Sequence, residues 1–97
     1  MEVLAKQASK IVELETNHKD AILEVAFNWL GNKMATCSTD QRVKVWIKDE
    51  EGGWSKQVDF EAHDQTITCL QWAHPDFGTL LATCSYDGTI KIWEEIK

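Results

Sequence analysis

Short runs in which apolar and polar residues alternate dominate this chain. RVKVWI (residues 42–47) has Val43, Val45 and Ile47 at alternate positions, and TIKIWE (residues 89–94) has Ile90 and Ile92. A period of two is typical of β-strands, because successive side chains point to opposite faces of a sheet. Outside the first dozen residues, no stripe with the helical period of about 3.6 residues persists beyond one turn. The pattern predicts an all-β protein.

Six further strands are expected at matching places in the two halves of the chain. They are KIVELET (10–16), AILEVAF (21–27), KMATCS (33–38), SKQVDFEA (55–62), TITCLQW (66–72) and LLATCS (80–85). TDQ and YDG, which precede the two alternating runs, have the chemistry of tight hairpin turns. In KIVELET the apolar Val12 and Leu14 lie six and four residues before His18, whereas in SKQVDFEA Val58 and Phe60 lie five and three residues before His63. This difference indicates a bulge in one of the two strands or a different pairing of the N-terminal strand.

The chain contains an internal repeat. ATCSTDQRVKVW (residues 35–46) returns 47 residues later as ATCSYDGTIKIW (residues 82–93). Four short antiparallel strands in about 45 residues are typical of one blade of a β-propeller. We therefore expect an N-terminal segment with a leading strand at 1–17, a first repeat at 18–62, and a partial second repeat with three strands at 63–97.

Composition and charge limit the function. The chain has 97 residues, ten Lys and Arg, and a net charge of −6, so no basic stripe for direct nucleic-acid binding is expected. No apolar run reaches the ~18 residues that would insert into a membrane, and the first ten residues do not resemble a secretory signal. The three cysteines lack a CxxC spacing, which favours free thiols in the cytosol or nucleus.

The repeated residues resemble the WD-repeat family. The Gly-His positions of that family read Asn17-His18 and Ala62-His63 here, and the Trp-Asp positions read Trp46-Ile47 and Trp93-Glu94. The resemblance implies two four-stranded antiparallel blades, the second of them partial, in an incomplete propeller. It also implies one buried hydrogen-bond relay per blade, with Thr36 and Thr83 as alternatives for the hydroxyl group. The relay residues would be His18, Ser38, Asp40 and Trp46 in the first blade, and His63, Ser85, Asp87 and Trp93 in the second.

Catalysis and metal binding are the competing interpretations of these residues. The relay imitates a Ser-His-Asp triad, but a hydrolase needs one exposed nucleophile and an oxyanion hole, whereas this set occurs twice, each time with a tryptophan. The histidines, His74 included, and the cysteines show no spacing typical of zinc ligands. We therefore expect a protein that is not an enzyme and that holds no metal or cofactor.

A narrower resemblance covers residues 18–96. WAHPDFG, the CS-x-D pairs, the DEEGGW hairpin and the ending IWEEI are similar to small propeller nucleoporins of the Seh type and to their Sec-thirteen relatives in the COPII vesicle coat. This resemblance implies a scaffold subunit of the Y-shaped nuclear pore complex, or of a complex that regulates TOR signalling. Its propeller would be completed by a blade that a helical nucleoporin or coat subunit adds as a strand.

Alternatives remain open at this stage. Two blades cannot close a ring that typically needs about four to eight, so we expect a fragment of a longer propeller or self-association through open blade edges. A COPII coat subunit would place the protein in the cytoplasm or at the endoplasmic reticulum, and a TOR-regulating complex at the lysosomal surface, instead of the nuclear envelope. A peptide-recognition adaptor, such as a ubiquitin ligase substrate receptor, is disfavoured because Arg42 is the only arginine.

Overall fold

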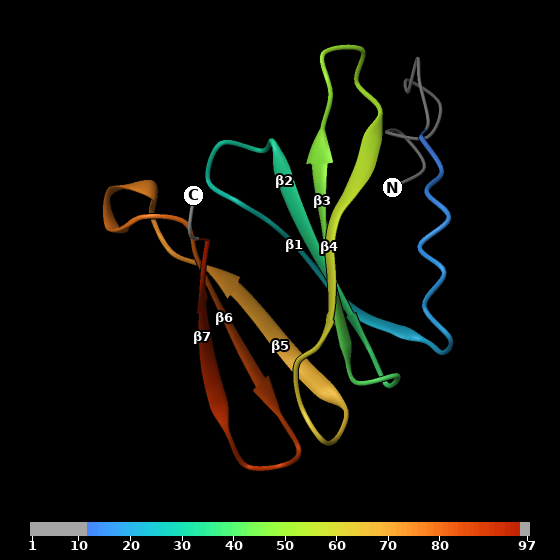
Figure 1. Cartoon of the computed structure of the whole chain (residues 1–97), viewed down its shortest axis with the longest axis vertical. Helices are drawn as coiled ribbons and strands as arrows, with labels where there is room; N and C mark the ends of the chain where they lie inside the picture. The colour runs from blue at the N-terminus through green and yellow to red at the C-terminus, as the bar shows by residue number, and fades with distance from the viewer. Residues whose placement is uncertain (1–11, 96–97) are drawn as a thin grey trace, which may run out of the picture.

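Two antiparallel sheets make up the computed structural model, which describes residues 12–95 (Figure 1). The first sheet contains β1 (Ile22–Phe27), β2 (Lys33–Ser38), β3 (Arg42–Lys48) and β4 (Trp54–Glu61), hydrogen-bonded in chain order. The second contains β5 (Ile67–Trp72), β6 (Leu80–Ser85) and β7 (Ile90–Glu94), with a 3-10 helix, η1 (Pro75–Phe77), between β5 and β6. The prediction of an all-β fold with two blades of an incomplete propeller is confirmed.

The two sheets occupy consecutive parts of the chain, and within residues 12–95 no strand precedes the first sheet. The first sheet lies within 18–62, and the second, with three strands among the described residues, lies within 63–97. The strand expected at KIVELET begins outside the described residues, and residues 12–16, which are described, form no strand. Their position is set in part by the Lys44 Nζ atom on β3, which donates a hydrogen bond of 2.8 Å to the Thr16 carbonyl oxygen.

The turns between the second and third strands of each sheet have the same geometry. In the first sheet the Gln41 N–H donates to the Ser38 carbonyl at 3.2 Å, and in the second the Gly88 N–H donates to the Ser85 carbonyl at the same distance. Gln41 has φ of 71° and Gly88 has φ of 85°, so both adopt the left-handed conformation. Glycine is unstrained there and glutamine is not. The TDQ turn therefore has the same backbone conformation as the YDG turn, and Gln41 adopts it at some conformational cost.

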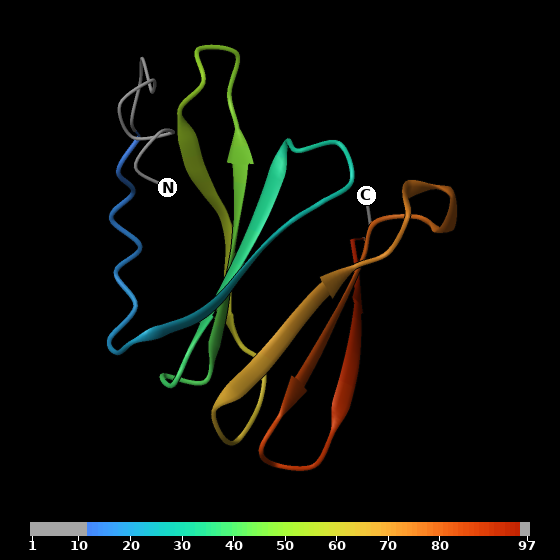
Figure 2. The same ribbon diagram turned by 180° about the vertical axis from the view of Figure 1, so that it is seen from behind.

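The core lies where the two sheets face each other. Strand β5 packs against β1 and β2, and the two views show the sheets side by side (Figure 1 and Figure 2). One core cluster of buried apolar residues draws on both sheets and on the segment that joins them; it contains Ala35, Cys37, Val43, Val45, Ala62, Ile67, Leu70 and Leu81. Burial of apolar surface in this layer is the main favourable contribution to stability. The described residues include no helix that is long and apolar enough to cross a membrane.

Candidate functional site

A hydrogen-bonded chain of four side chains lies in the first sheet. The His18 Nδ1 atom is 2.9 Å from Asp40 Oδ2, and its Nε2 atom is 2.8 Å from Thr36 Oγ1. The Trp46 Nε1–H group donates to the same Thr36 oxygen at 3.2 Å. A carboxylate only accepts and an indole only donates, so the His18 Nδ1–H donates to Asp40 and the Trp46 N–H donates to Thr36 Oγ1, whose hydroxyl group also lies 3.5 Å from the Lys44 carbonyl oxygen. Every polar atom of the chain then has a partner.

The second sheet repeats this arrangement. The His63 Nδ1 atom is 3.0 Å from Asp87 Oδ2, and its Nε2 atom is 2.7 Å from Thr83 Oγ1. The Trp93 Nε1–H group donates to Thr83 Oγ1 at 3.0 Å. This copy has one additional member, because Thr89 Oγ1 also lies 3.1 Å from His63 Nδ1. The same geometry thus arises from residues 45 to 47 positions apart in the sequence.

The hydroxyl group in each chain belongs to threonine, and the serines predicted from the family pattern lie elsewhere. Ser38 Oγ accepts a hydrogen bond of 3.1 Å from the Asp40 N–H, and Ser85 Oγ accepts one of 3.1 Å from the Asp87 N–H. Each serine is the last residue of its strand, so its side chain serves the turn that follows. Thr36 lies two residues earlier on β2, within reach of both the imidazole and the indole. The assignment of Ser38 and Ser85 to the relay is corrected accordingly.

The carboxylates are held in their ionised form. Desolvation by burial would raise the pKa of Asp40, but hydrogen bonds from His18 and from the Arg42 and Lys19 N–H groups outweigh it, so that the pKa is lowered. The pKa of Asp87 lies well below its usual range, chiefly because the Thr89 side chain donates a hydrogen bond to it. Hydrogen bonds to the charged form favour that form. Each aspartate therefore remains an acceptor at neutral pH.

Two lysines that the sequence analysis did not single out hold the backbone just before the relay histidines. Lys44, with only 3% of its surface exposed, donates to the carbonyl of Thr16 at 2.8 Å, and Lys91 donates to the carbonyl of Ala62 at 3.0 Å. Each ammonium group thereby holds the segment that leads to the relay histidine. The signal was present, since lysine occupies the same place in VKVW and IKIW. A lysine in an alternating strand is easily taken for a solvated residue.

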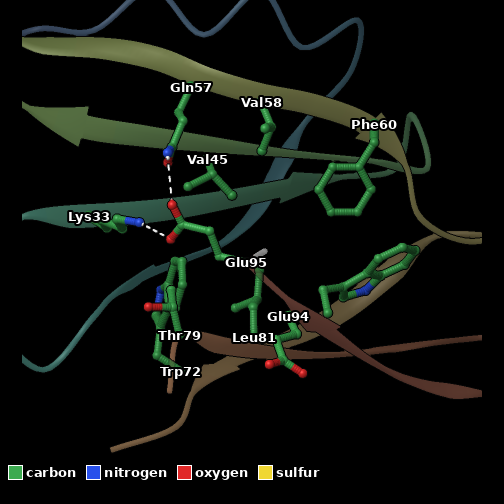
Figure 3. Close-up of a pocket in the computed structure, with 11 residues that line it drawn as sticks. Lys33, Val45, Gln57, Val58, Phe60, Trp72, Thr79, Leu81, Glu94 and Glu95 are labelled. Carbon is green, nitrogen blue, oxygen red and sulfur yellow. Dashed lines mark hydrogen bonds and ion pairs between the residues drawn. The ribbon is translucent and has the colours of Figure 1, made fainter. Parts of the chain in front are cut away.

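A cleft of about 210 Å³ lies between the sheets (Figure 3). Its apolar wall includes Val45, Phe60 and Leu81. At one end Glu95 lies between Lys33, with which it forms an ion pair, and Gln57, whose Nε2 atom donates to Glu95 Oε1 at 3.3 Å. These polar contacts join the second sheet to the first at the mouth of the cleft.

The groups that imitate a catalytic triad are enclosed. Thr36 and Thr83 are 2% and 1% exposed, and each oxygen already accepts an indole N–H. A hydrolytic nucleophile must reach its substrate. Among residues 12–95, no three His, Cys, Asp or Glu side chains lie close enough together to hold a metal ion. The arrangement can stabilise a blade internally.

Comparison with known proteins agrees with this geometry. The model of the family "WD domain, G-beta repeat" matches residues 9–46 and 54–94. "Nucleoporin SEH1" of Homo sapiens and "Nucleoporin SEH1-A" of Xenopus laevis are each 47% identical over 83 residues, which is 86% of this chain and 23% of theirs. "Nucleoporin seh1" of Drosophila melanogaster is 48% identical over 62 residues, 64% of this chain and 18% of the relative. The resemblance inferred from the motifs is confirmed, and the chain spans about a fifth of the length of these relatives.

Proposed function

The chain belongs to the WD domain, G-beta repeat family, and from this premise we propose that it acts in a non-catalytic scaffold subunit of the nuclear pore, of the Seh type. The names of its relatives support the assignment to a nucleoporin. The observation that carries the scaffold role is the enclosure of both relays, in which hydroxyl, imidazole and carboxylate satisfy one another. Such satisfied networks make a blade rigid and leave no group for chemistry.

Within residues 12–95, the second sheet has no strand that corresponds to β4 of the first. Among the described residues β7 pairs only with β6, whereas β3, its counterpart, pairs with strands on both sides. Ile90 and Ile92 on β7 are 73% and 61% exposed. An unpaired strand edge beside apolar side chains favours addition of a further strand. A strand of this protein that follows these residues would pair with this edge equally well, and the resemblance implies, separately, a helical nucleoporin that contributes a blade to the propeller at the nuclear envelope.

Two neighbouring roles follow from the same resemblance. A COPII coat subunit would use the same kind of scaffold at the endoplasmic reticulum, and a TOR-regulating complex would use it at the lysosomal surface. A receptor for phosphorylated peptides is less well supported, because Arg42 is the one arginine of the sequence and its Nε–H group already donates to Asp59 Oδ1 at 2.6 Å.

Affinity capture from the source cells tests the proposal. The tag is placed at the endogenous locus, so that any sequence flanking these residues is retained. Large helical pore subunits in the captured fraction, with fluorescence at the nuclear rim, support the proposal. Coat subunits, or cullin-type ligase components, would replace it with the corresponding alternative. Purified chain incubated with generic ester substrates should show no turnover, and turnover that Thr36→Val or Ser38→Ala abolishes would refute the non-catalytic role.

A further inference from the structure

Two cysteines face each other across the second sheet. Cys69 on β5 is directly opposite Cys84 on β6 in the antiparallel register. A bulge between Ile67 and Cys69 places Thr68 against the same partner, and the Thr68 Oγ1 atom lies 3.5 Å from Cys84 Sγ. Two residues of a bulged strand then oppose one residue of its neighbour. The Cys69 and Cys84 side chains therefore share one face of the sheet.

This placement suits a disulfide bond. Directly opposite residues of an antiparallel pair have Cα atoms about 4.5–5.5 Å apart. Disulfides bridge Cα separations of about 4.4–6.8 Å. Cys69 is exposed and Cys84 is half-buried, and both are free thiols. A small reagent can thus reach Cys69 first, with Cys84 adjacent to it.

The first sheet holds a natural comparison. Its corresponding bulge pairs Glu24 with Cys37, at the positions that Cys69 and Cys84 occupy in the second sheet. Cys37 is completely buried, and burial, followed by the Glu24 carboxylate, raises the pKa of its thiol to about 11. At this repeat position the first sheet has Glu24 and the second has Cys69, so Cys84 faces a thiol across its sheet, whereas the buried Cys37 faces a carboxylate.

We propose that Cys69 and Cys84 form a thiol modification site at which a low-molecular-weight disulfide, RS–SR, closes an intramolecular disulfide bond. The Cys69 thiolate attacks one sulfur of RS–SR, which gives a mixed disulfide and releases RS⁻. The Cys84 thiolate then attacks the Cys69 sulfur, which forms the Cys69–Cys84 bond and expels the second RS⁻. The two thiol protons end on the two RS⁻ groups. The protein dithiol loses two electrons, and RS–SR gains them to become two RSH.

Glu24 controls the rate of the first step. The Leu70 N–H donates to Glu24 Oε2 at 2.6 Å, which holds this carboxylate of the first sheet next to the neighbouring Cys69. The carboxylate is the largest cause of the raised pKa of Cys69, followed by burial and by Cys84. Because the thiolate is the nucleophile, a nearby negative charge slows the attack. Glu24→Gln removes the charge and keeps an oxygen that can accept from Leu70.

The experiment treats the full chain with oxidised glutathione and follows intact mass and peptide mapping over time. The expected product has lost two hydrogens and contains a Cys69–Cys84 link, and its Tm is higher than that of the reduced chain because the bond limits the unfolded state. Cys84→Ser should stop at a mixed disulfide on Cys69. Cys37→Ser should form the bond at the parental rate, and Glu24→Gln should form it several-fold faster.

Other products would overturn the proposal. A stable mixed disulfide in the parent chain would show that Cys84 cannot reach Cys69, and a link to Cys37 would show that the partner thiol comes from the first sheet and not from Cys84. Retention of all three thiols would show that no reactive site exists. An unchanged rate in Glu24→Gln would remove the role of Glu24. None of these outcomes depends on the protein being a nucleoporin, since the site lies within one blade.

Discussion

The Trp72 indole N–H donates a hydrogen bond of 2.9 Å to the backbone carbonyl of Ala26, which connects β5 of the second sheet to β1 of the first. The residue at the same place in the first repeat is Phe27, which has no N–H to donate and instead lies with its ring 5.8 Å from that of Trp54. The two repeats therefore differ where the second one attaches to the first. With the Leu70–Glu24 hydrogen bond and the contacts of Glu95, it adds direction to an interface whose core is apolar.

Trp72→Phe should weaken the attachment of the sheets. The substitution keeps an aromatic ring and removes the donor, so we expect a loss of about 0.5–1.5 kcal/mol in the free energy of unfolding. Urea unfolding of the full chain measures it. Trp29→Phe is the matched control, because Trp29 is 71% exposed and stacks on His74 through its ring; it should change stability by less than about 0.5 kcal/mol. Equal losses in the two variants would show that the Trp72 bond is absent in solution.

Thr36→Val should be more costly than Ser38→Ala. Valine keeps the shape of threonine but leaves the His18 Nε2 atom and the Trp46 N–H without their common partner, in a fully buried place. Leaving buried polar groups unsatisfied costs about 1–3 kcal/mol. Ser38→Ala removes one hydrogen bond to the Asp40 N–H, worth about 1 kcal/mol. Chemical denaturation of both variants decides between the hydroxyl groups.

The second sheet provides an independent repetition of that comparison. Thr83→Val and Ser85→Ala should show the same order of stability, since the distances around Thr83 match those around Thr36. If Ser38→Ala is less stable than Thr36→Val, or Ser85→Ala is less stable than Thr83→Val, the serine and not the threonine supplies the relay hydroxyl in that sheet.

The repeat made much of this structure predictable from sequence. Period-two alternation located β3 and β7, and the repeat with its turn residues located the other strands. The paired spacing of histidine, aspartate and tryptophan located the side chains that the structure brings together in each sheet. Because the pattern occurs twice, residues that recur at the same position in both repeats could be recognised as residues that serve the fold.

The other features of the structure depended on how deeply each side chain is buried and on which groups it contacts, and a sequence does not show either. Thr36 and Ser38 are two positions apart on β2 and so share a face. Their roles differ because the Thr36 hydroxyl contacts His18 and Trp46, whereas the Ser38 hydroxyl accepts from the Asp40 N–H. The described part of KIVELET is apolar enough for a strand but forms none, since a strand also needs a neighbour to pair with. Lys44 alternates like a solvated residue, yet it is buried against Thr16.

Asp40→Asn should flatten the acid limb of the stability profile. The pKa of Asp40 is lower in the folded state than its ordinary value of 3.8, so the unfolded state binds the proton more readily. Its contribution is fully present above about pH 4 and is lost as the pH falls through the folded pKa. The parent should therefore lose stability below about pH 4 more steeply than Asp40→Asn. Urea midpoints measured from neutral pH downward test this, and parallel profiles would show that Asp40 is not stabilised as a carboxylate.

Leu81→Ala should be among the most destabilising single changes in the second sheet. Leu81 is 3% exposed and forms part of the wall between the sheets with Val45 and Phe60, so its truncation leaves a cavity in the shared core. Such a change costs about 2–5 kcal/mol, a large part of the 5–15 kcal/mol or so that stabilises a typical domain. Ile92→Ala removes an apolar side chain of similar size from β7, but Ile92 is 61% exposed in this chain, so the loss should stay below about 1 kcal/mol. Guanidinium unfolding of the two variants compares them directly, and similar losses would mean that the second sheet does not pack on the first through Leu81.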